Sequence, residues 1–258
     1  MSKTEILGVK IDNLSLQEVL EKIDGFLESK NKYFVVTPNP EFLVAAQKDK
    51  SFKEILNYAD IAIADGIGLI HAAKFLGQRL QRVTGVDLFG YLCQLAEQKS
   101  YPVYLLGSGE GIALKTAGVL KQTFPNLNIV GAEAGGIISA AGIAQDTELI
   151  IRINQAKPKI LFVGFGQVKQ EKWIFKYLDQ LSSVQLAIGL GGTFDYVSDN
   201  ITRAPELVRN LGFEWLYRLI KEPWRWRRIF NAIVIFPLLV LREKIFKKNR
   251  NQESRITN

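Results

Sequence analysis

Up to about residue 200, short apolar runs rich in β-branched residues alternate with segments in which apolar residues recur every three or four positions. The first pattern is typical of buried strands and the second of amphipathic helices. Their alternation predicts an α/β fold, here a Rossmann-like, mainly parallel sheet flanked by helices. The expected strands are 6–11, 33–37, 61–64, 103–106, 128–131, 160–163 and 185–188, and the expected helices are 16–28, 41–57, 87–98, 112–123, 147–154 and 170–181.

From Pro205 onward the spacing is helical alone, with apolar residues four apart from Leu207 to Leu219. Pro223 interrupts this pattern, and the 13 largely apolar residues 229–241 then lie between a Trp/Arg cluster and further cations. As a helix, such a run rises about 20 Å, which is too short for the roughly 30 Å hydrocarbon core of a bilayer. Its flanking residues favour a helix lying in the headgroup region of an anionic membrane. Docking on the body or on another subunit, as in a homo-oligomer, is the alternative.

The charge is distributed unevenly along the chain. Residues 203–258 hold 13 Lys/Arg and 5 Asp/Glu, a net charge of +8, whereas residues 1–202 hold 20 and 21 and sum to −1. We therefore expect an α/β domain over 1–202 and a basic, amphipathic helical membrane-association appendage over 203–258. A nucleic-acid binder more often spreads its positive charge over the folded domain, so no nucleic-acid partner is expected.

Cysteine usage and the N-terminal sequence bear on the compartment. The single cysteine, Cys93, cannot form an intrachain disulfide, and no Cys/His cluster is spaced to hold zinc. The first residues lack the apolar core of a signal peptide, and no run of about 18 apolar residues occurs. These features predict a cytoplasmic protein.

Polar side chains follow two of the expected strands, where parallel sheets bind ligands. Thr37 ends one strand and Asn39 follows it, and Asp65 follows the next and precedes Gly66 and Gly68. A carboxylate in this place can act as a general base on a substrate hydroxyl, and the glycines allow close approach. The alternatives are that Asp65 caps the following helix and that Thr37 and Asn39 form a turn and an N-cap.

Further loops carry candidate ligand contacts. Arg82 precedes an expected helix, as a contact to phosphate or sugar requires. Gly191, Gly192 and Asp195 follow the last expected strand, where they can receive a flat base or sugar, although a structural turn is the alternative. The glycine-rich loops at 107–111 and 164–167 do not complete the dinucleotide fingerprint, and the sequence shows no Walker A motif or paired aspartates for a divalent metal. No cofactor is expected.

These residues and their surroundings resemble the bacterial glycosyltransferase family called WecG/TagA/CpsF. The resemblance implies a metal-independent, inverting enzyme that moves N-acetylmannosamine, or a related sugar, from a UDP donor to polyprenyl-diphosphate-linked N-acetylglucosamine. The reaction would take place at the inner face of the plasma membrane, in the synthesis of a surface polymer such as the teichoic acid linkage unit. The matching blocks are TPN at 37–39, DGIG at 65–68, RVTGVD at 82–87, KQEKW at 169–173, GGTFD at 191–195, RAP at 203–205 and GFEWLYRLIKEP at 212–223.

The resemblance also implies roles for the candidate residues. Asp65, Thr37 and Arg82 form the expected catalytic set, with Asp65 as the base, and the domain over 1–202 binds the nucleotide sugar. The family is thought to complete its active site with the C-terminal appendage, so arginines there are expected to meet the donor diphosphate. The remaining expected substrate contacts are Asn39, Gly66, Gly68, Gln167, Gly191, Gly192, Asp195, Arg209, Arg218 and Arg225.

Three other functions compete with this interpretation. A transferase of the same family could use a UDP-N-acetylmannosaminuronic acid donor. A nucleotide-dependent oxidoreductase would use Glu133 as its ribose acid, but the incomplete glycine fingerprint argues against it. A noncatalytic protein of membrane surfaces or nucleic acids would use Trp224 and Trp226 as stacking groups, but the neutral body and its polar strand ends argue against it.

Overall fold

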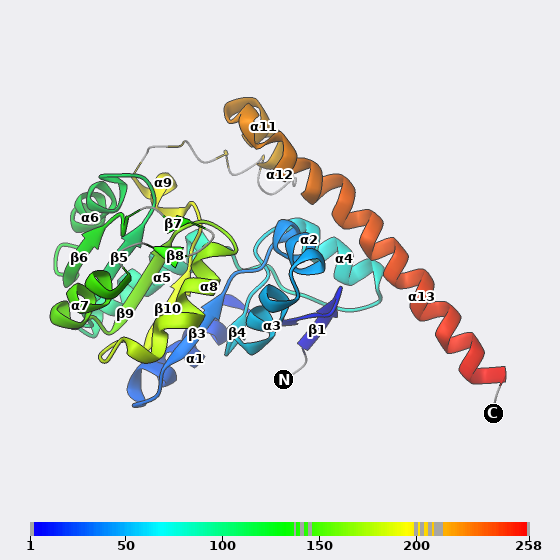
Figure 1. Ribbon diagram of the computed structural model, residues 1–258, viewed down its shortest axis with the longest axis horizontal. Coiled ribbons are helices and arrows are strands. Elements are labelled where there is room, and N and C mark those ends of the chain that lie inside the picture. The colour runs from blue at the N-terminus through cyan, green and yellow to red at the C-terminus, as the bar shows by residue number, and fades with distance from the viewer. Residues whose placement is uncertain are drawn as a thin grey trace.

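The computed structural model places a six-stranded sheet at the centre of the protein (Figure 1). It describes residues 3–136, 138–139, 142–143, 146–198, 201, 204–205, 208 and 214–256. Neighbouring strands of this sheet all run parallel, in the order β4-β3-β10-β9-β5-β6, which confirms the predicted fold class. The strands are β3 (Tyr33–Val36), β4 (Ile61–Ala62), β5 (Val103–Gly107), β6 (Ile129–Glu133), β9 (Ile160–Gly164) and β10 (Leu186–Gly189).

Helices cover both faces of the sheet, because its strands carry apolar residues on both sides. In β3, Phe34 and Val36 pack in one core layer and Val35 in the other. The layer with Val35 is built from α1 (Leu16–Glu28), α5 (Gly85–Gln98), α6 (Ile112–Thr123) and α9 (Thr193–Val197). The opposite layer is built from α2 (Pro40–Lys48), α3 (Lys50–Tyr58), α4 (Ile67–Phe75), α7 (Asp146–Ala156) and α8 (Lys169–Tyr177).

The prediction of one strand over 6–11 is wrong. The structure has an antiparallel hairpin there, formed by β1 (Lys3–Ile6) and β2 (Val9–Asp12). Its two turn residues, Leu7 and Gly8, both have positive φ angles of 53° and 77°, as the tight turn that joins twisted strands requires. The apolar alternation continues through this turn, so the sequence pattern does not reveal it.

The prediction of one helix over 41–57 is also wrong. The chain leaves helical geometry at Asp49, whose carboxylate accepts a hydrogen bond of 3.0 Å from the Phe52 backbone N–H and so caps α3. Residues on both sides of the break contribute to the same core, and their spacing therefore reads as one amphipathic helix. The other expected strands agree with the structure within two residues at either end. So do the other expected helices, except that 170–181 ends in a 3₁₀ turn, η1 (Leu178–Gln180). A short hairpin of β7 (Ile138–Ser139) and β8 (Gly142–Ile143) adds to the predicted elements.

The C-terminal region is a chain of helices in which two prolines shape the path. Pro223 follows the end of α11 and begins η2. Pro237 has no backbone N–H and its ring crowds the preceding turn, and just before it the chain widens into a π-helical turn, in which the Phe236 N–H bonds to the Asn231 carbonyl five residues back. The elements are α11 (Glu214–Lys221), η2 (Pro223–Arg225), α12 (Trp226–Phe230), η3 (Asn231–Ile235) and α13 (Phe236–Ile256).

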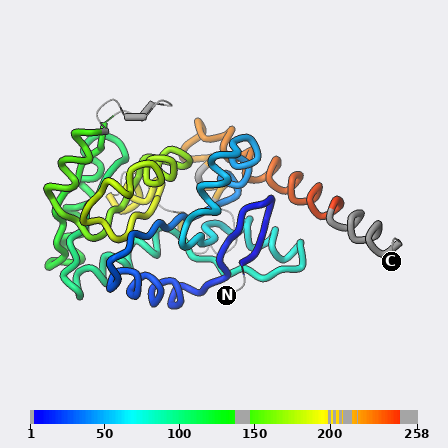
Figure 2. The backbone as a smooth tube through the Cα atoms, turned by 60° about the horizontal axis from the view of Figure 1, so that its bottom comes forward, coloured from blue at the N-terminus to red at the C-terminus, as the bar shows by residue number. Residues whose placement is uncertain are grey.

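The first part of α13 packs on the body of the protein. Phe236 and Val240 are 2% and 3% exposed and belong to the core layer that contains α2. Glu243 accepts a hydrogen bond of 3.0 Å from the Leu7 backbone N–H, which ties α13 to the N-terminal hairpin. Further along, α13 leaves the body and extends outward (Figures 1 and 2).

Candidate active site

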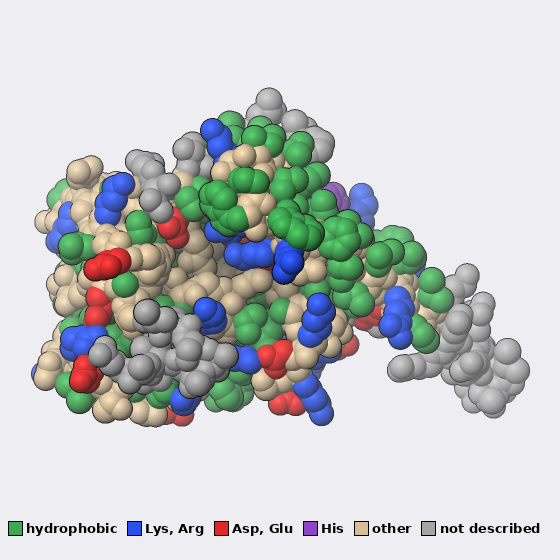
Figure 3. Space-filling model, turned by 45° about the horizontal axis from the view of Figure 1, so that its top comes forward, with side chains coloured by type: hydrophobic (Ala, Val, Ile, Leu, Met, Phe, Trp, Pro, Cys, Tyr) green, Lys and Arg blue, Asp and Glu red, His purple; other side chains and the backbone are tan. Residues whose placement is uncertain are grey.

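A cavity of about 1030 Å³ lies at the carboxyl edge of the sheet. Its polar walls come from the loops that follow β3, β4, β5, β9 and β10, and its outer wall comes from residues of α11 to α13. Figure 3 shows the hollow beside hydrophobic side chains, with Lys and Arg side chains in and around it. The volume suits a ligand of nucleotide-sugar size, which the edge of a parallel sheet commonly binds. Of the predicted site residues, the cavity is lined by Thr37, Asn39, Asp65, Gly66, Gly68, Arg82, Gln167, Gly191, Gly192, Asp195 and Arg225.

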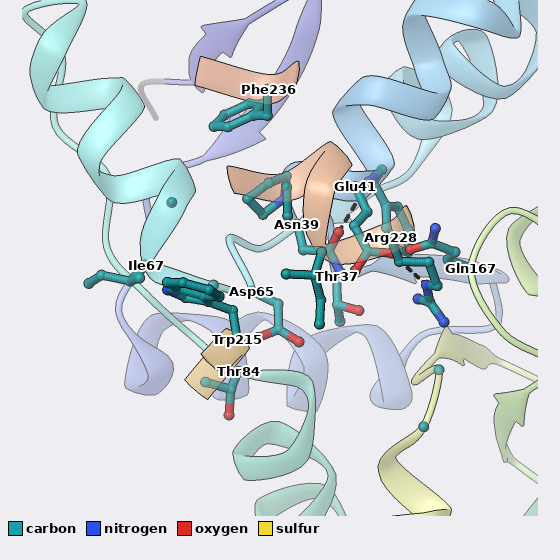
Figure 4. Close-up of a pocket in the computed structure, with 18 of the residues that line it drawn as sticks. Thr37, Asn39, Glu41, Asp65, Ile67, Thr84, Gln167, Trp215, Arg228 and Phe236 are labelled. Atoms are coloured by element: carbon teal, nitrogen blue, oxygen red, sulfur yellow. Dashed lines mark hydrogen bonds and ion pairs between the residues drawn. The ribbon is translucent and has the colours of Figure 1, made fainter. Parts of the chain in front are cut away.

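Asp65 lies where β4 gives way to α4, but it does not cap α4. The N-cap of that helix is Gly66, which has a φ angle of 115° and provides no side-chain bond. The Asp65 carboxylate instead accepts a hydrogen bond of 3.3 Å from the Gly85 backbone N–H, at the start of α5. The positive end of the α5 dipole favours the charged carboxylate. The capping alternative for Asp65 is therefore wrong, and its carboxylate borders the cavity (Figure 4).

Thr37 and Asn39 line the cavity and also have structural roles. The buried Thr37 hydroxyl donates a hydrogen bond of 3.1 Å to the Gly189 carbonyl, which joins the ends of β3 and β10. The Asn39 side-chain oxygen accepts one of 3.1 Å from the Phe42 N–H and caps α2, so the N-cap alternative for this residue is confirmed. Both side chains are thus fixed by the elements that they terminate.

The loops after β9 and β10 supply further polar groups. The Gln167 side-chain oxygen is buried at the cavity and has no hydrogen-bond partner among the described residues. Asp195 accepts a hydrogen bond of 3.3 Å from the Ser108 hydroxyl, so the loops after β5 and β10 meet there. Arg82 reaches the cavity from the segment that pairs with the end of β4 through Ala64.

The C-terminal helices bring cations to the same cavity. The Arg225 guanidinium donates a hydrogen bond of 2.7 Å to the buried Glu222 carboxylate. Arg228 pairs with Glu41 at 2.7 Å and lines the cavity beside it (Figure 4). The predicted contact Arg209 and the side chain of Arg218 lie outside the described residues.

Several residues of this site were not predicted from the sequence, including Arg228, Glu41 and Trp215. Arg228 follows Arg225 by three positions and so shares its helical face, a spacing that could have indicated it. Glu41 and Trp215 carry no comparable signal, because each enters the site through contacts between distant segments. An apolar wall was also missed, and it contains Phe75, Ile229, Ile233, Phe236, Val240 and Leu241.

Next to these loops lies a buried polar pair, Gln170 and Glu171, which are 1% and 0% exposed, and Gln170 also lines the cavity. The Glu171 carboxyl accepts hydrogen bonds from the Gln170 side-chain amide at 2.6 Å and from the Val168 N–H at 2.7 Å. Burial raises the pKa of Glu171 to about 8, although these hydrogen bonds oppose the rise.

Within the described ranges, no three His, Cys, Asp or Glu side chains converge in a way that could hold a metal ion. None of the helices in the described part of the chain has both the length and the apolar character needed to cross a bilayer.

The fold and the site together define a class of protein. A parallel α/β sheet with a carboxylate, glycine-rich loops and arginines around one cavity is typical of an enzyme that acts on an anionic, nucleotide-like substrate. The chain belongs to the glycosyl transferase WecG/TagA/CpsF family, whose model matches residues 4–250, and it is therefore a glycosyltransferase.

Named relatives cover nearly the whole chain. It is 34% identical over 251 residues to the N-acetylglucosaminyldiphosphoundecaprenol N-acetyl-beta-D-mannosaminyltransferase of Bacillus subtilis (strain 168), an alignment that covers 96% of this chain and 94% of that protein. It is 32% identical over 248 residues to the protein of the same name from Staphylococcus aureus (strain MW2), with 94% of each chain covered.

Proposed function

We propose that this enzyme transfers N-acetylmannosamine from a UDP donor to N-acetylglucosamine linked through diphosphate to a polyprenyl lipid, without a metal ion and with inversion at the anomeric carbon. The names of its relatives support the sugar and the acceptor. The structural observation that carries the proposal is the meeting of Asp65 with Arg225 and Arg228 of the C-terminal helices in one cavity. The product would serve the assembly of a surface polymer such as the teichoic acid linkage unit.

The donor would occupy the part of the cavity formed by the loops after β9 and β10. Gly191 and Gly192 leave room for the uridine, and the Asp195 carboxylate can accept hydrogen bonds from it. Gln167 would meet a hydroxyl or amide N–H of the sugar, because its buried side-chain oxygen requires a donor. Arg82 and Arg225 would face the diphosphate.

The reaction then follows as a single displacement. Asp65 takes the proton from the acceptor hydroxyl while that oxygen forms a bond to the anomeric carbon, on the face opposite UDP. The bond between the anomeric carbon and the diphosphate oxygen breaks, and its electron pair leaves with UDP. Arginines held in place by Glu222 and Glu41 would stabilise the charge that develops on this leaving group.

The acceptor lipid would approach along the apolar wall of the cavity. That wall is continuous with the C-terminal helices, whose outer surface exposes large hydrophobic side chains among cations (Figure 3). Such a surface fits an anionic membrane, so the enzyme would act as a peripheral protein on the inner face of the plasma membrane. The exposed members of this surface include Ile220, Trp224, Trp226, Phe230, Leu238 and Leu241.

The test is UDP release from the purified protein, given UDP-N-acetylmannosamine and a lipid-diphosphate-N-acetylglucosamine acceptor, with and without EDTA. We expect release that requires the acceptor and is unchanged by EDTA. Release that EDTA abolishes would overturn the metal-free mechanism. Tight UDP binding without turnover would overturn the assignment of UDP-N-acetylmannosamine as the donor. The next assay would then use the uronic-acid donor.

A further inference from the structure

Two loops that line the cavity are joined by a network of hydrogen-bonded side chains, one of which, Gln170, also lines the cavity. The turn at 165–168 follows β9 and carries Gln167, and the loop at 190–192 follows β10 and carries the two glycines of the predicted uridine contact. The Gly191 backbone N–H donates to the Gln170 side-chain oxygen at 2.9 Å. The Gln170 amide donates to one oxygen of Glu171, and the Val168 N–H donates to the other.

The direction of these hydrogen bonds is fixed along the whole chain. Both oxygens of Glu171 face an N–H donor, and the ionised carboxylate can accept both hydrogen bonds whereas a carboxamide cannot. Gln170 must then turn its amide nitrogen toward Glu171 and its oxygen toward Gly191. If the Gln170 side-chain amide were turned over, its N–H group would face the Gly191 N–H. Two donors would then meet in a buried site, where an unpaired donor costs free energy.

Two backbone features accommodate this network of hydrogen-bonded side chains. A Cβ atom added to Gly189 would lie 2.6 Å from a Glu171 oxygen and 2.7 Å from the Gln170 nitrogen, so only glycine leaves room for the pair. Val168 has a φ angle of 70°, which is rare for a β-branched residue, and its N–H is held in this conformation by Glu171. The turn therefore depends on the carboxyl group behind it.

We infer that Gln170 and Glu171 are positioning residues, whose buried hydrogen bonds hold the 165–168 turn and the 190–192 loop in the arrangement that receives the donor nucleotide. This inference rests on the function proposed above. Glu171 acts through the Val168 N–H and Gln170 through the Gly191 N–H.

The test exchanges the two side chains. Glu171→Gln alone keeps nearly the same side-chain shape but replaces one carboxyl oxygen with an NH₂ group. That NH₂ group then faces either the Gln170 amide nitrogen or the Val168 N–H, both of which are donors. Adding Gln170→Glu again gives each N–H donor an acceptor. The new carboxylate accepts from the Gly191 N–H and from the introduced amide at position 171, whose oxygen accepts from the Val168 N–H. Lys172→Gln is the matched control, since it removes an ion pair with Asp49 from the same helix without touching the cavity.

Two readouts separate this inference from the function on which it rests. The first is amide hydrogen exchange over residues 189–198, which needs no ligand. We expect about tenfold faster exchange in Glu171→Gln and recovery in the double variant, since one buried hydrogen bond is at stake. The second is UDP binding, which should weaken about tenfold in the single variant and recover in the double variant, with Lys172→Gln unchanged in both assays.

If amide hydrogen exchange over residues 189–198 were as slow in Glu171→Gln as in the wild type, the inference would be overturned. A double variant no better than the single one would also overturn it, because packing alone, without hydrogen-bond direction, would then explain the pair. Wild-type protein that binds no UDP would overturn the proposed function, and the exchange rates would still decide whether the pair holds the loops.

Discussion

Asp65→Asn is the substitution that tests the proposed chemistry most directly. The asparagine oxygen can still accept the hydrogen bond that the Gly85 N–H makes with Asp65 at 3.3 Å, so the connection to α5 is kept. The amide of asparagine is not basic, so it cannot accept the proton of the acceptor hydroxyl. General-base catalysis contributes about 10²- to 10⁴-fold. We therefore expect kcat to fall by that factor, which corresponds to about 3 to 5 kcal/mol in the activation free energy.

The assay is acceptor-dependent UDP release under saturating substrates, combined with a UDP titration by calorimetry. The dissociation constant for UDP should change little, because the role proposed for Asp65 is on the acceptor. Asp60→Asn is the matched control. Asp60 immediately precedes β4, at the end of the strand opposite Asp65, and its carboxylate accepts a hydrogen bond of 2.8 Å from the Phe34 N–H. The same chemical change there should leave kcat at the wild-type value.

A kcat in Asp65→Asn within about threefold of wild type would refute the assignment, because it is far below the contribution of a general base. An equal fall in both variants, accompanied by a lower melting temperature, would show that the substitutions act through folding.

Three further predictions concern buried and paired groups. Because burial raises the pKa of Glu171 to about 8 from its ordinary 4.5, the folded protein holds this proton more tightly than the unfolded chain, and the free energy of unfolding should fall as pH rises between these values. At about 1.4 kcal/mol per pKa unit, the wild type should lose several kcal/mol relative to Glu171→Gln between pH 5 and pH 9, and parallel stability curves would contradict this. Cys93 is fully buried and its pKa is raised by burial, so a thiol reagent should label it only after denaturation, and immediate labelling of the native protein would contradict the structure. Arg228→Gln breaks the pair with Glu41 and should lower kcat/KM roughly tenfold or more, while destabilising the fold by less than about 1 kcal/mol. Arg242→Gln, which changes an exposed arginine of α13, is the control, and equal losses of activity in the two variants would refute the catalytic role of Arg228.

The sheet could be predicted because each of its strands is a short apolar run buried on both faces. The N-terminal hairpin could not, since Ile6, Val9 and Ile11 keep an alternating pattern on both sides of a two-residue turn. The break at Asp49 was missed for a similar reason: apolar residues before and after it share one core, and a single capping carboxylate interrupts the helix without altering that spacing.

Asp65 and Asn39 could be identified because the carboxyl ends of neighbouring parallel strands converge, so residues that directly follow those strands meet. The pair of Glu41 with Arg228 could not, because it joins residues 187 positions apart. Their contact depends on how the C-terminal helices return across α2, and no local pattern encodes that path. The burial of Gln170 and Glu171 could not be predicted either, because it depends on the absence of a side chain at Gly189 on a different element.

The order of the segments along the chain affects how the enzyme is made. The sheet, Asp65 and the glycine loops all precede residue 199, whereas the outer wall of the cavity comes from residues 215–241. A chain emerging from the ribosome can therefore assemble the part of the site at the sheet edge while the outer wall is still being synthesised. The hydrogen bond from the Leu7 N–H to Glu243 can also form only after residue 243 has been synthesised. We therefore expect the α/β core to fold first and the complete cavity to form late in biosynthesis.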